Sequence, residues 1–243
     1  MANEHIVKSF DQELETLRRT IVQMGGLAES QLELAIQAVV RRDADLAGRV
    51  MRSDEQMDAY EVSVDNVAIR SLALRQPMAV DLREVVSALR IASDLERIGD
   101  YAANIAKRSL ALAQVPVVRP VTTLPRMGRM VQQIIKDVLD AYTERDLDKA
   151  LSAWRQDESV DDLYTSLFRE TLTYMMEDPR NITPCTHLLF IAKNIERIGD
   201  HATNIAELIH FLLTGKPVTD VRPKGDATSF TVVNPEAKPE ENV

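Results

Sequence analysis

The chain has 243 residues, of which 45% are apolar, 28% charged and 5% aromatic, and its formal net charge is −9. This length allows one large domain or two of roughly 100–120 residues, and the acidic charge argues against a nucleic-acid binder, which needs clustered Lys and Arg. A single cysteine, Cys185, excludes an internal disulfide. Because we find neither a secretion signal nor a membrane-spanning apolar stretch, we expect a cytoplasmic protein without direct membrane insertion.

Three helices are predicted in residues 1–114. In the first helix, apolar residues recur three and four positions apart, which is typical of helices that pack into bundles. Asp43 or Asp45 can cap the second helix. Pro77 ends it, and Asp81 can cap the third helix. The expected helices cover about residues 6–40, 43–74 and 81–112.

The second half repeats this plan. Residues 115–124 are rich in proline without a helical pattern, which predicts a linker. In the second half, residues 125–214, Thr183 followed by Pro184 is a helix start signal. Residues 215–243 are rich in Pro, Gly and Glu, and we expect a mostly disordered tail there. The expected helices cover about residues 124–143, 146–176 and 183–213.

An internal duplication underlies this plan. Residues 91–106 read IASDLERIGDYAANIA and residues 191–206 read IAKNIERIGDHATNIA, with eleven of sixteen positions identical. A repeat of this length indicates that one structural unit occurs twice. The sequence therefore predicts an all-α, elongated protein of six long helices, arranged as two tandem three-helix bundles.

The E-R-I-G-D block places two acids on one side of its helix. At about 100° per residue, Glu96 and Asp100 lie on one stripe. Small residues beside this stripe, Gly99 among them, leave the carboxylates accessible or let another backbone approach closely. The core-facing side carries Leu95, Ile98, Ala102 and Ile105.

The preceding helix of each half carries an acidic stripe as well. If consecutive helices pack antiparallel, the two stripes of a half can face each other, and their carboxylate oxygens suit hard cations such as Mg²⁺, Mn²⁺, Ca²⁺ or Fe³⁺. The alternative, which the sequence leaves open, is that these are ordinary solvated helix faces. The stripe is Asp54, Asp58, Glu61 and Asp65 in the first half, and Asp157, Asp161, Tyr164 and Phe168 at the matching positions of the second.

Histidines give little support to a catalytic metal centre. Glu207 and His210 match the Glu-x-x-His motif of di-iron helical bundles, which require two such motifs, and the first half has no counterpart. His201 aligns with Tyr101, so no histidine ligand is duplicated. A carboxylate-bridged metal oxidoreductase therefore remains only an alternative function.

Three motifs together resemble the PhoU family: the doubled E-R-I-G-D at residues 96–100 and 196–200, the M-G-G-L segment at 24–27 and the Y-M-M-E-D segment at 174–178. The resemblance implies a non-enzymatic regulator of phosphate homeostasis, a homodimer, which restrains phosphate uptake and keeps the phosphate-starvation (Pho) regulon off. It implies two partners, the ATPase subunit of the phosphate ABC transporter and the phosphate sensor histidine kinase (PhoR).

The resemblance also implies possible metal ions, because some family members bind metal clusters through an E(D)-x-x-x-D motif. The ion expected from it is Mg, Mn, Fe or Zn. Carried onto this sequence, the candidate ligands are Asp54, Asp58, Glu96, Asp100, Asp157, Asp161, Glu196 and Asp200.

Overall fold

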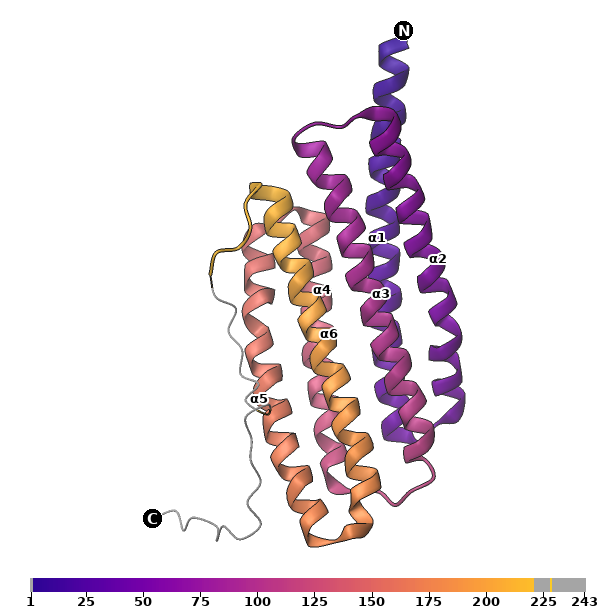
Figure 1. The fold of residues 1–243 in the computed structure, drawn as a ribbon, viewed down its shortest axis with the longest axis vertical. Coiled ribbons are helices and arrows are strands. Elements are labelled where there is room, and N and C mark those ends of the chain that lie inside the picture. Colours follow the sequence, from indigo (N-terminus) through magenta and orange to yellow (C-terminus); the bar gives the residue numbers. More distant parts are fainter. Residues whose placement is uncertain (1, 221–227, 229–243) are drawn as a thin grey trace.

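The computed structural model describes residues 2–220 and 228, and this part of the chain is helical without a strand. The prediction of an all-α, elongated protein with six long helices is confirmed (Figure 1). Most of the predicted disordered tail, 215–243, lies outside the described residues. The helices are α1 (Ala2–Arg41), α2 (Ala44–Arg75), α3 (Val80–Leu112), α4 (Leu124–Glu144), α5 (Leu147–Glu177) and α6 (Ile182–Thr214), with short 3₁₀ helices at Arg119–Thr123 and Pro179–Asn181.

Two of the predicted helix starts need correction. Asp43 does cap α2, since its carboxylate accepts hydrogen bonds from the backbone N–H groups of Asp45 and Leu46 at 2.9 and 3.0 Å. Asp81, by contrast, lies inside the first turn of α3, which begins one residue earlier. Thr183 likewise lies inside α6, because that helix begins at Ile182 directly after a 3₁₀ turn.

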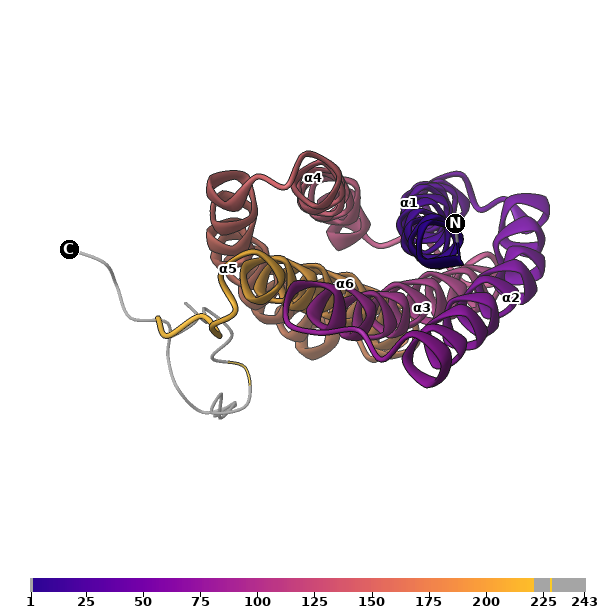
Figure 2. The same cartoon turned by 90° about the horizontal axis from the view of Figure 1, so that it is seen from above.

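The two halves of the chain lie side by side along their length. Helices α3 and α6 pack against each other at the centre, α1 packs against α4, and α2 and α5 lie at the two outer edges (Figure 2). Each half keeps its own three helices together. No helix of one half is inserted between the helices of the other, as the duplication predicts.

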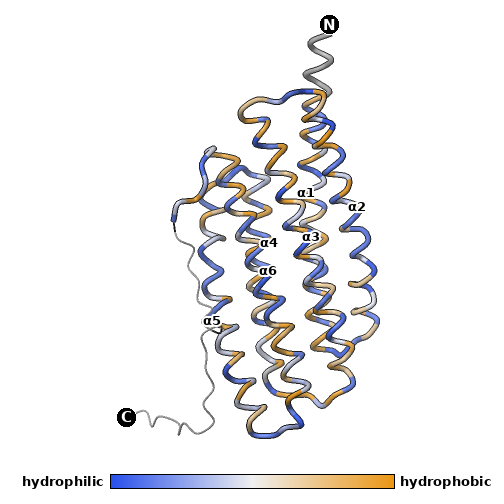
Figure 3. The backbone as a smooth tube through the Cα atoms, viewed as in Figure 1, coloured by the Kyte–Doolittle hydropathy of each residue, from blue (hydrophilic) through white to orange (hydrophobic). Residues whose placement is uncertain are grey.

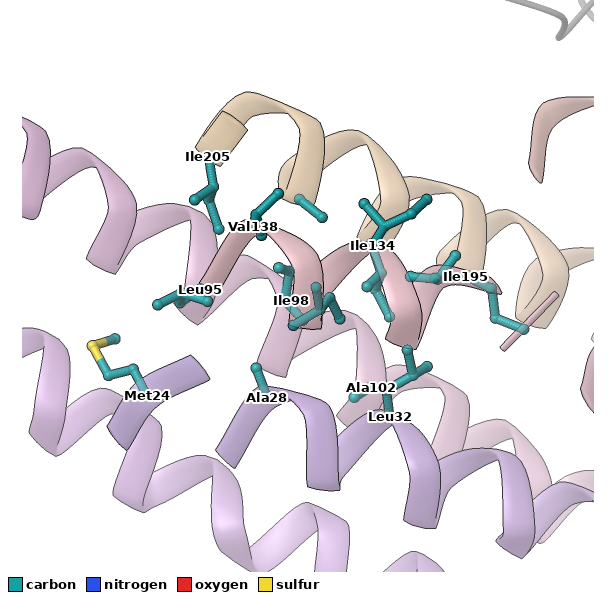
Figure 4. Packing of buried hydrophobic residues seen from close by; sticks show 14 of the residues in the cluster. Met24, Ala28, Leu32, Leu95, Ile98, Ala102, Ile134, Val138, Ile195 and Ile205 are labelled. Atoms are coloured by element: carbon teal, nitrogen blue, oxygen red, sulfur yellow. The ribbon is translucent and has the colours of Figure 1, made fainter. Parts of the chain in front are cut away.

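A single apolar core runs through both halves. Buried side chains of α1, α3, α4 and α6 meet between the halves (Figure 4), and hydrophilic and hydrophobic residues alternate along each helix (Figure 3). Among the described residues, no helix is both long and apolar enough to cross a membrane. The labelled residues of this core are Met24, Ala28, Leu32, Leu95, Ile98, Ala102, Ile134, Val138, Ile195 and Ile205.

Glycines bring α1 and α4 close together in a way that follows the repeat. A Cβ atom on Gly25 of α1 would lie 2.3 Å from Cδ2 of Leu139 on α4. A Cβ atom on Gly128 of α4 would lie 2.9 Å from Cγ1 of Ile36 on α1. When the two halves are aligned, Gly25 corresponds to Gly128 and Ile36 corresponds to Leu139. The contact between α1 and α4 is therefore approximately symmetric.

A buried ionic network joins the halves at one end. Glu84, at the start of α3, is only 3% exposed and forms ion pairs with Arg18 of α1 and with Arg145, the residue after α4. Nη2 of Arg145 lies 2.6 Å from Oε2 of Glu84. Burial opposes ionisation of Glu84, but the two arginines outweigh it and hold the pKa of this carboxyl below its ordinary value. The charged network therefore ties α1, α3 and α4 together.

Candidate functional site

The acidic residues of the first half form a surface cluster between α2 and α3, as the sequence predicts. We call Asp54 and Asp58 of α2 with Glu96 and Asp100 of α3 the first acidic cluster. The charge of Asp100 acts on both Asp54 and Glu96, so the two stripes face each other across the helix pair. Asp58 is exposed, and the other three side chains are partly exposed. This cluster is open to solvent.

Negative charge is in excess in the first acidic cluster. Burial, and after it the charge of Asp100, raises the pKa of Glu96 to about 7. Burial, followed by the charges of Asp100 and Asp58, raises the pKa of Asp54. Arg97 is one basic neighbour, with Nη1 3.1 Å from Oδ2 of Asp100 and Nε 3.5 Å from Oε2 of Glu96. Lys107 is a second, and its charge opposes the rise in the pKa of Asp54. Two basic side chains thus lie near four carboxyl groups.

Three of the four matching residues of the second half are buried, and Asp200 is half-buried. We call Asp157 and Asp161 of α5 with Glu196 and Asp200 of α6 the second acidic cluster. Asp157, Asp161 and Glu196 are 1%, 2% and 4% exposed. Nζ of Lys193 lies 2.8 Å from Oε1 of Glu196. Burial raises the pKa of Glu196 to about 7, helped by Asp200 and Asp161 and opposed by the lysine.

The glycine of each E-R-I-G-D block makes room for side chains. A Cβ atom on Gly199 would lie 2.7 Å from Oδ1 of Asp157, so the glycine leaves space for that carboxylate. A Cβ atom on Gly99 would lie 3.0 Å from Oε1 of Gln31 and 3.3 Å from Cγ of Met57. The expected close approach is therefore present, but the atoms that approach belong to side chains and not to a backbone.

The donor chemistry of the first acidic cluster fits a hard cation, because its side-chain donors are carboxylate oxygens. Its geometry is less complete: across residues 2–220 and 228, no three His, Cys, Asp or Glu side chains converge as they would around a bound ion. In the second acidic cluster an ammonium group already lies against Glu196. The residues of the first cluster therefore fit a metal better than those of the second.

The two residues of the Glu-x-x-His motif, Glu207 and His210, bind other protein groups and not each other. Glu207 accepts a hydrogen bond of 2.9 Å from the indole N–H of Trp154, and Nδ1 of His210 lies 2.9 Å from the carbonyl oxygen of Lys216. His201 joins the two halves, with Nδ1 2.7 Å from Oδ1 of Asp94 on α3. None of these contacts builds a di-iron site in the described part of the chain.

Sequence reasoning missed two of the groups that shape these clusters. Lys193 carries the counter-charge in the second cluster, and its only sequence signal was a mismatch with Ser93 in the aligned repeat. Gln31, fully buried on α1, packs beside Gly99 and donates a hydrogen bond of 3.0 Å to Oγ of Ser53. It lies on the first helix, where we had looked for apolar periodicity alone.

Comparison with known proteins agrees with the repeat and the fold. The PhoU domain model matches this chain twice, at residues 21–109 and 124–209. A phosphate-specific transport system accessory protein PhoU homolog of Caulobacter vibrioides is 54% identical over 227 residues, which are 93% of this chain and 99% of that one. The homolog of Rhizobium meliloti is 51% identical over 230 residues, 94% of this chain and 97% of that one.

Solved structures agree as well. The crystal structure of PhoU from Pseudomonas aeruginosa matches with a TM-score of 0.83 at 40% identity, covering 85% of this chain and all of that one. The phosphate transport system regulatory protein PhoU from Streptococcus pneumoniae matches with a TM-score of 0.80 at 32% identity, covering 87% of this chain and all of that one. With two PhoU domains that span most of its length and relatives of this similarity, the chain belongs to the PhoU family.

Proposed function

We propose that this chain is a non-enzymatic regulator of phosphate transport, which restrains uptake and keeps the phosphate-starvation genes off when phosphate is plentiful. The observation that carries the proposal is the match of both PhoU domains, together with relatives that align over nearly their whole length and are named accessory proteins of the phosphate-specific transport system. The carboxyl groups of the two clusters lie beside Arg97 and Lys193, without an organised nucleophile and base.

The finer proposal is an adaptor that contacts two proteins: the ATPase subunit of the phosphate ABC importer and the phosphate sensor histidine kinase. The first acidic cluster supports it, because carboxylates in excess over their basic neighbours Arg97 and Lys107 attract a basic partner surface. We also propose that the chain acts as a homodimer in the cytoplasm.

Deletion of the gene in its host is the experiment that tests the regulatory proposal. We expect a phosphate-starvation reporter to be expressed at high phosphate in the deletion strain, and to be silenced again by a plasmid copy of the gene. Purified chain should also retain the ATPase subunit of the phosphate importer in a pull-down, with the ATPase of an unrelated importer as the control. A reporter that stays low and phosphate-responsive in the deletion strain would contradict the proposal.

As a second property, we propose that the first acidic cluster binds one or more metal ions. The ion is Mg²⁺, Mn²⁺ or an iron ion, and Zn²⁺ is a less favoured alternative. Asp54, Asp58, Glu96 and Asp100 would hold the metal. A bound cation would neutralise the excess charge and link α2 to α3. Burial, and after it the charge of Asp100, raises the pKa values of Asp54 and Glu96, and a shared cation would relieve both the lost hydration and the repulsion between these carboxylates.

A melting experiment tests this second property. We expect Mn²⁺ to raise the melting temperature of the chain relative to chelator, since an ion that binds the folded state alone adds about 2.7 kcal/mol when present at 100 times its dissociation constant. Asp58→Asn combined with Asp100→Asn should abolish the shift. Glu55→Gln, which removes an exposed charge next to Asp54 on the same helix, is the matched control and should keep it. An equal shift in both variants would place the metal elsewhere.

A further inference from the structure

The two acidic clusters have the same four carboxyl groups but different neighbours. In the aligned repeat, Lys193 takes the position of Ser93, and Tyr164 takes the position of Glu61. At these two positions the second cluster gains a positive charge and loses a negative one, whereas Lys107, which acts on Asp54 in the first half, is replaced by Glu207 in the second. Because both clusters are built on equivalent helices of one chain, each half serves as the reference for the other.

The lysine is held inside the second cluster by two contacts. Its Nζ lies 2.8 Å from Oε1 of Glu196, one turn further along α6, and 4.9 Å from the centre of the Tyr164 ring on α5. A lysine ammonium over an aromatic face gains electrostatic attraction from the ring. The ring of Tyr164 itself packs against that of Phe168, with centroids 6.4 Å apart. Two aromatic side chains therefore stand where the first half has acids.

Burial makes this positive charge necessary. Asp157, Asp161 and Glu196 are nearly inaccessible to water, and carboxylates that lose their hydration need a nearby positive charge or must take up protons. Because Lys193 belongs to the same helix as Glu196, its positive charge is always present and does not depend on the binding of an ion from solution. A metal ion entering the second cluster would first have to displace the ammonium group and leave it without its carboxylate.

The first acidic cluster has no lysine at the position of Lys193, and its basic neighbours are Arg97 and, near Asp54, Lys107. Ser93 is exposed there, and Glu61 adds a further carboxyl group whose pKa is raised by burial and by Asp65. Arg97 lies on the solvent side of the cluster, with 56% of its side chain exposed, whereas the side chain of Lys193 is 29% exposed. The first cluster is open, short of positive charge and accessible to an ion from solution.

We propose that Lys193 is a built-in cation that replaces a metal ion in the second acidic cluster, so that the first half alone responds to free cations. The two halves would then have separate tasks: in the second, Lys193 occupies the place beside Glu196 that a metal ion would need, and the first is the cation-dependent one. The statement about the first half rests on the metal binding proposed above, whereas the statement about Lys193 is independent of it.

Lys193→Ser, which restores the residue of the first half, tests the proposal in the full-length chain. We measure Mn²⁺ binding by titration and the melting temperature with and without chelator. In chelator, Lys193→Ser should melt lower than the unmodified chain. It should gain about one Mn²⁺ per chain, and Mn²⁺ should recover most of the lost melting temperature. Adding Asp161→Asn should remove the new Mn²⁺ site.

The unmodified chain supplies the second arm. Asp161→Asn combined with Asp200→Asn should leave its Mn²⁺ binding unchanged, whereas Asp58→Asn combined with Asp100→Asn should abolish it. If Lys193→Ser gains no Mn²⁺ and no Mn²⁺-dependent stability, or if the unmodified chain loses Mn²⁺ when the second cluster is changed, the proposal is wrong.

If Lys193→Ser gains the site while the unmodified chain binds no Mn²⁺ at all, Lys193 is confirmed as the built-in cation and the metal proposal for the first half fails separately. Should Lys193→Ser be poorly folded in chelator, Lys193→Ser with Asp161→Asn removes one charge of each sign and should melt closer to the unmodified chain.

Discussion

Gly25→Ala is expected to lower the free energy of unfolding by about 1–3 kcal/mol, the usual cost of forcing extra atoms into a packed core. The new Cβ atom would lie 2.3, 2.5 and 2.9 Å from Cδ2, Cδ1 and Cγ of Leu139. Rotating one methyl group away cannot relieve a clash with all three atoms, so either the whole side chain of Leu139, which is half-buried, must turn away or α1 and α4 must move apart. This is one of the contacts that join the two halves, and we expect the loss in thermal and urea unfolding alike.

The neighbouring glycine is the control for this prediction. A Cβ atom on Gly26 would meet nothing within 4 Å, and alanine is favoured over glycine in a helix by about 1 kcal/mol. Gly26→Ala should therefore stabilise the chain. Gly128→Ala, whose Cβ would lie 2.9 Å from Ile36, should destabilise it less than Gly25→Ala does. If Gly25→Ala and Gly26→Ala behaved alike, the close packing of α1 against α4 would be incorrect.

Much of the fold could be predicted because its signals are local. Apolar residues three and four positions apart indicate helices that bury one face, and Asp43 caps α2 through bonds to residues two and three positions away. Helix α6 shows the limit of such signals. Thr183 and Pro184 were predicted to start it, but the first N–H groups of any helix lack partners, so a proline anywhere in the first turn is tolerated.

The packing of the halves was beyond sequence reasoning because it depends on contacts between distant residues. Glu84 meets an arginine 66 residues before it and another 61 residues after it. His201 meets Asp94, which is 107 residues away. A charged residue near a helix start has the same local sequence signal whether it is solvated or buried in an ionic network. The duplication predicts two similar units, but not the faces through which they join.

The candidate clusters were predicted only in part, because local periodicity places residues on a helix face while their burial depends on distant residues. Helical periodicity placed Glu96 beside Asp100 and identified the facing stripe on α2, and both are confirmed. Periodicity does not reveal depth, however, and the burial of Asp161 in the second half was not anticipated. The contact between Lys193 of α6 and Tyr164 of α5 is likewise known only once the two helices are placed together.

The charge imbalance of the first cluster makes the stability of the chain depend on pH. In chelator, we expect Glu96→Gln to melt higher than the unmodified chain at pH 8 and to melt at nearly the same temperature near pH 4.5. The pKa of Glu96 is about 7 in the folded chain against an ordinary value of 4.5, with burial and then Asp100 as the causes. Below pH 4.5 the carboxyl group is protonated in both states, and its contribution to stability is complete. As the pH rises from 4.5 to 7, unfolding releases a proton and becomes more favourable, so this contribution is lost by pH 7.

The shift corresponds to at most about 3 kcal/mol, and solvent around the partly exposed cluster reduces it, so we expect the variant to gain about 1–2 kcal/mol at pH 8. Glu55→Gln removes the same charge from an exposed position on α2 and controls for net charge. Arg97 opposes the effect through its contact with Glu96. If Glu96→Gln melted lower than the unmodified chain at pH 8 in chelator, the attraction to Arg97 would outweigh burial and the repulsion from Asp100. The cluster would then be balanced without a metal ion, and its carboxylates would be available only for a partner protein.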